Sequence, residues 1–90
     1  QIIEREDNSW LVDGMLSVDE LKDFFHFSSL PDEEAADFQT VGGFMMTALG
    51  RVPEVTDTFH WLGYHFEVMD MDGMRVDKIL VKRDPNGKAS

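Results

Sequence analysis

The stretch from Thr40 to Pro53 (TVGGFMMTALGRVP) constrains the fold most, because it contains the start, the buried face and the end of one helix. Thr40 is a favourable N-cap residue. Gly50 is typical of the left-handed residue that ends a helix, and Pro53 lies just beyond it. Between these ends, apolar residues recur at helical spacing and predict one buried face: Val41, Phe44, Met45, Ala48 and Leu49.

Two adjacent glycines fall in the first turn of this helix, where each costs up to about 1 kcal/mol relative to alanine. Glycines at a helix start can hold a phosphate on backbone amides, so Thr40, Gly42 and Gly43 are candidate cofactor-binding residues. Such a site usually follows a strand and contains a third glycine or a lysine, whereas acidic residues precede this helix. We therefore favour the alternative, in which the missing side chains let the helix start pack closely against the sheet or the first helix.

An earlier helix is predicted from its own start and stop signals. Ser17 and Glu20 fit a capping box. The helix fades by Ser28, and Pro31 forbids its continuation. Its apolar face is aromatic and is built from Leu21, Phe24 and Phe25.

Strand patterns stand on both sides of the two helices. Ile2–Glu4 and Trp10–Val12 predict a hairpin around the polar residues 7–9. Residues 58–62 predict a third strand, and Gly63 ends it. A fourth strand follows, in which three apolar residues alternate with other side chains: Tyr64, Phe66 and Val68.

The last strand contains a change of spacing. Asp72-Gly73 predicts a tight hairpin turn before it. Val76 and Ile79 are three residues apart, and a strand that keeps one face buried needs an extra residue at such a point. We therefore predict a bulge at Asp77 or Lys78, with the ladder interrupted there.

These elements predict one α+β domain with the order β-β-α-α-β-β-β. The strands form a single antiparallel or mixed sheet, and the helices pack on one face of it. Residues 1–83 make the folded domain, and residues 84–90 (DPNGKAS) make a polar tail. Because the chain begins at Gln1, we expect a domain cut from a larger protein.

Composition excludes several classes of function. With 18 acidic and 8 basic residues the net charge is −10, which opposes nucleic-acid binding and direct contact with an anionic membrane surface. The absence of cysteine excludes disulfides, zinc–thiolate sites and thiol nucleophiles. No apolar run approaches the roughly 20 residues of a membrane helix, so we expect no direct membrane insertion.

Candidate chemical motifs are weak. Asp70 to Gly73 (DMDG) resembles the start of a calcium loop, but the remaining ligands are missing. Asp70 and Asp72 are kept only as candidates for a surface cation site, and no built metal site is expected. His60 and His65 lie on neighbouring predicted strands and can approach, but no motif supplies a third ligand. Because no nucleophile or acid–base motif is present either, we expect no catalytic residues and no enzyme activity.

Together, these landmarks resemble the CorC/HlyC transporter-associated domain, from about Trp10 to Val81. Any one of them is weak, but their order and spacing are specific. The pieces that carry the resemblance are WLVDG (10–14), TVGG (40–43), GRVP (50–53), FEV (66–68), DG (72–73) and RV (75–76).

The resemblance implies a cytoplasmic accessory or regulatory domain that follows transmembrane and CBS regions in magnesium/cobalt efflux or hemolysin-like proteins. The partners would be those regions of the parent protein, at the cytoplasmic face of the inner (cell) membrane, and a homodimer is left open. The fold of the family resembles part of FAD-binding domains, which makes a nucleotide- or flavin-binding sensor the alternative. The acidic surroundings of Gly42 and Gly43 oppose FAD, so no cofactor is expected.

Overall fold

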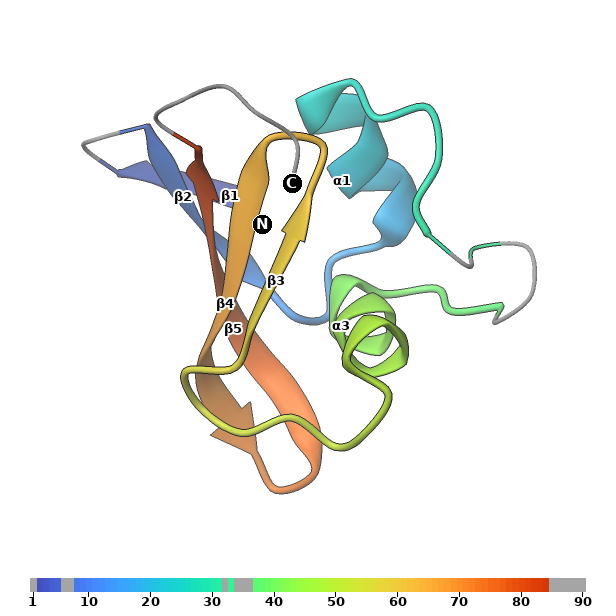
Figure 1. Cartoon of the computed structure of the whole chain (residues 1–90), viewed down its shortest axis with the longest axis vertical. Helices are drawn as coiled ribbons and strands as arrows, with labels where there is room; N and C mark the ends of the chain where they lie inside the picture. The colour runs from blue at the N-terminus through green and yellow to red at the C-terminus, as the bar shows by residue number, and fades with distance from the viewer. Residues whose placement is uncertain (1, 6–7, 32, 34–36, 85–90) are drawn as a thin grey trace.

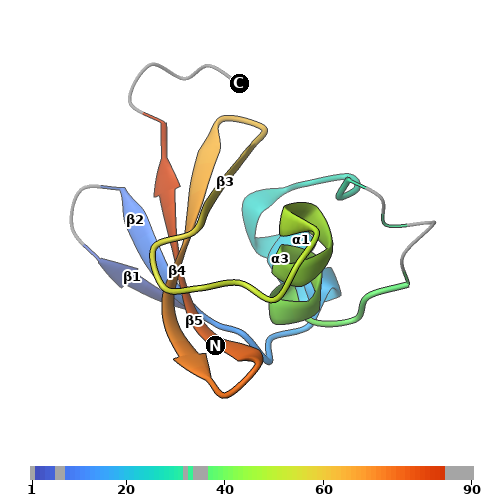
Figure 2. The same ribbon diagram turned by 60° about the horizontal axis from the view of Figure 1, so that its bottom comes forward.

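Five strands form one antiparallel sheet in the spatial order β1-β2-β5-β4-β3, and both helices cover the same face of it (Figures 1 and 2). The computed structural model describes residues 2–5, 8–31, 33 and 37–84. In chain order the elements are β1 (Ile2–Arg5), β2 (Ser9–Asp13), α1 (Val18–Phe25), α3 (Val41–Leu49), β3 (Thr58–Trp61), β4 (Tyr64–Asp72) and β5 (Arg75–Arg83).

The predicted α+β class and the order of elements along the chain are confirmed, and the sheet is the antiparallel one of the two types considered. The order across the sheet differs from the chain order. β5 lies between β2 and β4, so it joins the N-terminal hairpin to the C-terminal strands. In the N-terminal hairpin, residues 6 and 7 lie outside the described residues.

Two-residue loops connect β3 to β4 and β4 to β5. Leu62 and Gly63 both have positive φ (50° and 84°), which is the geometry that matches the twist of two paired strands. The second loop places Gly73 at φ 63°, and Asp72 pairs with Arg75 across it. The tight hairpin predicted at Asp72-Gly73 is therefore confirmed.

α1 begins and ends through local contacts. The Ser17 hydroxyl accepts a hydrogen bond from the Glu20 amide at 3.1 Å, as the predicted cap requires. The helix ends at Phe25, earlier than the predicted fade near Ser28. His26 adopts a left-handed conformation (φ 61°), and its N–H bonds to the Lys22 carbonyl, which closes the helix there.

α3 has the predicted ends. Thr40 caps it through a 3.1 Å bond from the Gly43 amide to the threonine hydroxyl oxygen. Gly50 ends it in the left-handed region at φ 75°. The apolar face of α3 presses on the sheet, where Val41, Phe44 and Met45 are fully buried.

The core lies between the two helices and the covered face of the sheet. α1 contributes Leu21 and Phe25, which are buried. The side chains that fill this layer from the sheet are Val12, Phe66, Val68, Val76, Ile79 and Val81. Among the described residues, no helix is long and apolar enough to cross a membrane.

The predicted irregularity in β5 is confirmed. Val76, Ile79 and Val81 are all fully buried, and Asp77 has no partner in the ladder between β4 and β5. β4 contains a matching extra residue, Met69, which was not predicted. Since each strand has one extra residue, the pairing register is the same on both sides of the irregularity.

The predicted tail begins at Asp84, whose amide donates to the Gly63 carbonyl at 2.8 Å. The remainder of the tail, residues 85–90, lies outside the described residues. The division into a domain of residues 1–83 and a tail of residues 84–90 therefore stays a prediction.

Candidate functional site

The first turn of α3 contains the candidate cofactor-binding residues, and its amides donate to protein acceptors. The Gly42 amide donates to the Gly14 carbonyl at 2.8 Å. The Gly43 amide donates to the Thr40 hydroxyl oxygen at 3.1 Å. The Val41 amide donates to the Leu16 carbonyl at 2.8 Å. A phosphate at this helix start would compete with each of these bonds.

Close packing accounts for one glycine of the pair. A Cβ at Gly42 would lie 3.0 Å from the Gly14 carbonyl oxygen and 3.2 Å from that of Val76. Both atoms belong to the backbone, so neither can move without shifting the β2–α1 connection or β5. At Gly43 the nearest atoms to a Cβ are 3.4 Å away, in Phe38 and Thr40. The close approach predicted for the pair is therefore at Gly42.

Gly14 is more tightly packed than Gly42 at the contact between the β2–α1 connection, the start of α3 and β5, and its packing role was not predicted. A Cβ there would lie 2.0 Å from the Val76 carbonyl oxygen. The Gly14 amide also donates to the Asp77 carbonyl at 2.8 Å, at the extra residue of β5. Gly14 directly follows β2, and the backbone that it faces is set by the tertiary pairing of β2 with β5, which the sequence does not reveal.

Asp70 and Asp72 are exposed near the end of the β4–β5 hairpin. Asp72 forms an ion pair with Arg75 at 3.0 Å, and Asp70 pairs with Lys78 in the strand register. The Asp72 carboxylate is therefore paired with a basic residue, whereas the Lys78 ammonium forms its ion pair with Asp77 at 3.3 Å. Over the part of the chain that the structure describes, no group of three or more His, Asp or Glu side chains converges as metal ligands. A surface cation site at Asp70 or Asp72 stays a prediction.

The loop from α3 to β3 is organised by an ion pair that the sequence did not reveal. Arg51 approaches both carboxylate oxygens of Asp57, at 2.9 Å each. Asp57 also accepts the Glu54 amide at 2.8 Å. The hydrogen bond from Arg51, together with that amide, lowers the pKa of Asp57. These contacts give Arg51 a structural role in the loop.

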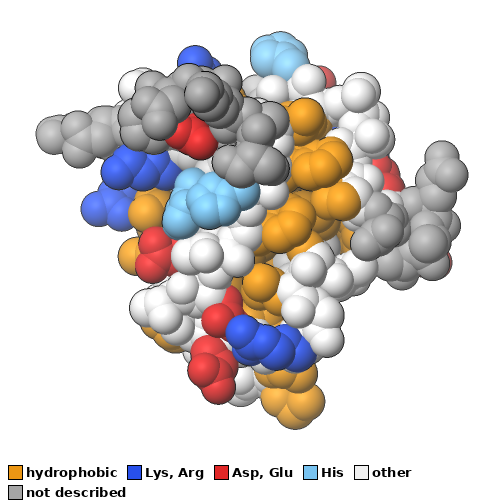
Figure 3. Space-filling model, viewed as in Figure 1, with side chains coloured by type: hydrophobic (Ala, Val, Ile, Leu, Met, Phe, Trp, Pro, Cys, Tyr) orange, Lys and Arg blue, Asp and Glu red, His pale blue; other side chains and the backbone are white. Residues whose placement is uncertain are grey.

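His60 and His65 meet on the uncovered face of the sheet, as their predicted strands allowed. His65 Nδ1 lies 2.8 Å from His60 Nε2. Burial lowers the pKa of His65, and the neighbouring His60 lowers it further. Around the pair is a hollow of about 370 Å³, which is also lined by Glu67, Leu80, Lys82, Arg83 and Asp84. Figure 3 shows histidine beside Lys and Arg side chains on one face of the molecule.

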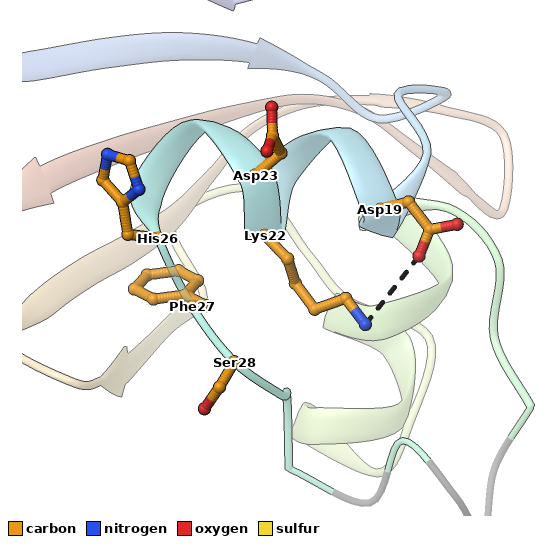
Figure 4. Close-up of a pocket in the computed structure, with 6 residues that line it drawn as sticks. All are labelled: Asp19, Lys22, Asp23, His26, Phe27 and Ser28. Atoms are coloured by element: carbon orange, nitrogen blue, oxygen red, sulfur yellow. Dashed lines mark ion pairs between the residues drawn. The ribbon is translucent and has the colours of Figure 1, made fainter.

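A second hollow, of about 460 Å³, lies along α1 and the residues after it (Figure 4). Its labelled side chains point in different directions, and Lys22 reaches back toward Asp19 at 3.8 Å. Lys22 also pairs with Glu33. The hydrogen bond from Lys22 lowers the pKa of Glu33 and raises that of Lys22. Lys22 is therefore engaged by two carboxylates, and the six labelled side chains do not converge on one point (Figure 4).

The family model for the CorC_HlyC transporter-associated domain matches residues 3–85 of this chain. The chain belongs to this family. The resemblance based on its motifs is therefore confirmed, and the chain is a transporter-associated domain.

Relatives of this CorC/HlyC domain are much longer proteins. The whole chain aligns with 43% identity to a UPF0053 protein of Synechocystis and covers 20% of that protein. With the polyamine export protein of Salmonella typhimurium the identity is 41%, over 96% of this chain and 19% of the relative. With the magnesium and cobalt efflux protein CorC of the same species the identity is 32%, over 83% of this chain and 24% of the relative. The chain thus spans about a fifth of these relatives.

Solved structures agree with the family assignment. The CorC_HlyC domain of a Xylella fastidiosa hemolysin, in complex with Mg²⁺ and Mn²⁺, is 34% identical. It superposes with a TM-score of 0.76 over 91% of this chain and 95% of that one. The α+β fold described above is therefore the fold of the family.

Proposed function

We propose that this chain is a non-catalytic accessory domain of a membrane exporter of cationic solutes, and that it modulates transport or assembly. The observation that carries the proposal is the match of residues 3–85 to the transporter-associated family. Longer relatives that match this chain are named as polyamine or as magnesium and cobalt exporters. In this arrangement the domain lies at the cytoplasmic face of the membrane, and its partners are the CBS and transmembrane regions of the parent protein.

The surface charge of the chain supports a cationic cargo. The net charge of −10 raises the local concentration of cations around the domain. Identity is higher to the polyamine export protein, at 41%, than to the magnesium and cobalt efflux protein, at 32%. Polyamines are therefore the first cargo to test.

A chimaeric exporter tests the proposal. In cells that lack their polyamine export protein, we compare the intact Salmonella exporter, the exporter without its C-terminal domain, and a chimaera that carries this chain in its place. Membrane levels of each exporter are measured by immunoblotting, and intracellular polyamines are measured after a polyamine load.

We expect deletion to change export per molecule of exporter or its level in the membrane, and the chimaera to restore at least half of the difference. A deletion that alters neither quantity would contradict a regulatory or assembly role. A correctly inserted chimaera that behaves like the deletion would contradict the assignment of this chain to such an exporter.

A further inference from the structure

We propose that His60 and His65 form a binding site for one divalent transition-metal ion of the nickel or copper type. This site is independent of the function proposed above. It rests on the way that the β3–β4 hairpin places two imidazole rings on the uncovered face of the sheet.

The hairpin register brings the two rings together. His60 and His65 are directly opposite each other, one pair inward from the Leu62–Gly63 loop. The Val68 amide donates to the Asp57 carbonyl at 2.9 Å, which makes Asp57 and Val68 a hydrogen-bonded pair. Hydrogen-bonded and non-hydrogen-bonded pairs alternate along an antiparallel ladder. His60 and His65 lie an odd number of pairs further along, so they form a non-hydrogen-bonded pair, in which side chains are closest.

The distance between the two nitrogens suits adjacent positions on one metal ion. His65 Nδ1 and His60 Nε2 are hydrogen-bonded at 2.8 Å, and a bound ion would replace the proton between them. Two nitrogens bound at about 2.0–2.1 Å with a right angle between their bonds lie about 2.9 Å apart. A tetrahedral angle requires about 3.3 Å. The pair therefore matches square-planar or octahedral ions that favour imidazole, such as Cu²⁺ and Ni²⁺, better than tetrahedral Zn²⁺.

A carboxylate lies behind one of the two ligands. Glu67 Oε1 is 3.9 Å from His65 Nε2, the ring nitrogen that faces away from His60. When the metal binds Nδ1, the ring proton resides on Nε2, and this N–H can donate a hydrogen bond to the Glu67 carboxylate after a small movement. Carboxylates in this position orient metal-binding histidines and increase their basicity.

The surroundings leave room for the ion and its water ligands. The hollow of about 370 Å³ opens beside the rings, and its charged residues are two basic and two acidic: Lys82, Arg83, Glu67 and Asp84. Arg83 lies over the Tyr64 ring and donates to the Tyr64 hydroxyl at 3.3 Å. With two protein ligands and water in the other positions, the ion is exchangeable.

Calorimetric titration of the full 90-residue chain with Ni²⁺ tests this proposal, using protein without a histidine tag in a non-coordinating buffer at pH 7.5. We expect saturable binding of one ion per chain. His60→Gln and His65→Gln should each weaken binding by at least about tenfold. The control His26→Asn, at the left-handed end of α1, should retain wild-type affinity. Circular dichroism must show the native fold in every variant.

A competition experiment identifies the ligand type. A hundredfold excess of Mg²⁺, which prefers oxygen ligands, should not displace Ni²⁺ from the histidine pair. Absence of saturable binding, equal affinity in a folded His60→Gln, His65→Gln double variant, or displacement by Mg²⁺ would overturn the proposal. The last two results would place the ion on surface carboxylates.

Discussion

Gly14 and Gly42 occupy the point where the β2–α1 connection, the start of α3 and β5 meet. At both positions the nearest atom to an added Cβ is a backbone carbonyl oxygen, at 2.0 Å and 3.0 Å respectively. Backbone in a paired strand cannot move aside as the end of a flexible side chain can. The two glycines are therefore required for close approach of backbone segments rather than for a special φ angle.

Alanine substitutions at three glycines test this interpretation. We expect Gly42→Ala to lower the free energy of unfolding by about 1–3 kcal/mol through overpacking, and Gly14→Ala to lower it by more. Gly43→Ala is the matched control, one position along the same helix turn. It should be neutral or stabilising by up to about 1 kcal/mol, because helix propensity improves. Urea denaturation measures all three, and a larger loss at Gly43 than at Gly42 would contradict the assignment.

Thr40 provides a second test at the residue level. Its hydroxyl oxygen accepts the Gly43 amide, so Thr40→Ala should lower the free energy of unfolding by about 1 kcal/mol. Thr40→Ser keeps the oxygen and should stay within about 0.5 kcal/mol of wild type. Urea denaturation of both variants distinguishes lost capping from lost packing of the methyl group. Equal losses in the two variants would show that the cap contributes little.

Sequence reasoning succeeded where one residue and its near neighbours determine the outcome. Ser17, Thr40 and Gly50 act as caps through contacts within a few residues. It failed to identify Gly14 because the atom that Gly14 approaches, the Val76 carbonyl oxygen, belongs to a residue 62 positions further along the chain. The choice between Gly42 and Gly43 depended on the same tertiary contact.

At the scale of elements, Lys22 and Glu33 connect α1 to the segment that follows it. The Glu33 carboxylate also accepts the Leu30 amide at 3.0 Å. Because the hydrogen bond from Lys22 lowers the pKa of Glu33 in the folded state, this group contributes stability above its unfolded pKa of about 4.3. That contribution is lost as the pH falls through the lower folded pKa.

We therefore expect Glu33→Gln to flatten the dependence of stability on pH between roughly pH 5 and pH 3. Chemical denaturation at a series of pH values measures the slope. Glu4→Gln removes an exposed carboxylate from β1 and controls for the loss of one negative charge. The prediction fails if Glu33→Gln keeps the slope of the wild-type protein, or if Glu4→Gln flattens it as much.

The strands illustrate the same division between local and distant information. The three-residue spacing of Val76 and Ile79 predicted an extra residue in β5, and Asp77 is that residue. The matching residue in β4, Met69, was not predicted, because Met69 is itself apolar and masks the three-residue spacing of Val68 and Met71, which belong to or pack against the core. The insertion of β5 between β2 and β4 depends on long-range pairing, which periodicity does not encode.

For the whole molecule, the helix start and the net charge lead to the same conclusion about cofactors. The amides of Gly42 and Gly43 donate to the Gly14 carbonyl and the Thr40 hydroxyl. The charge of −10 opposes an anionic dinucleotide at long range. We infer that Gly42 is required for close backbone packing in an accessory domain, and that Gly42 and Gly43 do not form the phosphate-binding turn of a flavin sensor.

Titration of the isolated chain with FAD at low salt, followed by flavin fluorescence, distinguishes these two roles of the helix start. Low salt maximises any electrostatic attraction between protein and ligand. We predict no saturable change in fluorescence at micromolar concentrations of protein and FAD, and no flavin retained after dialysis. Saturable one-to-one quenching in the low micromolar range would contradict the claim and identify the domain as a flavin sensor.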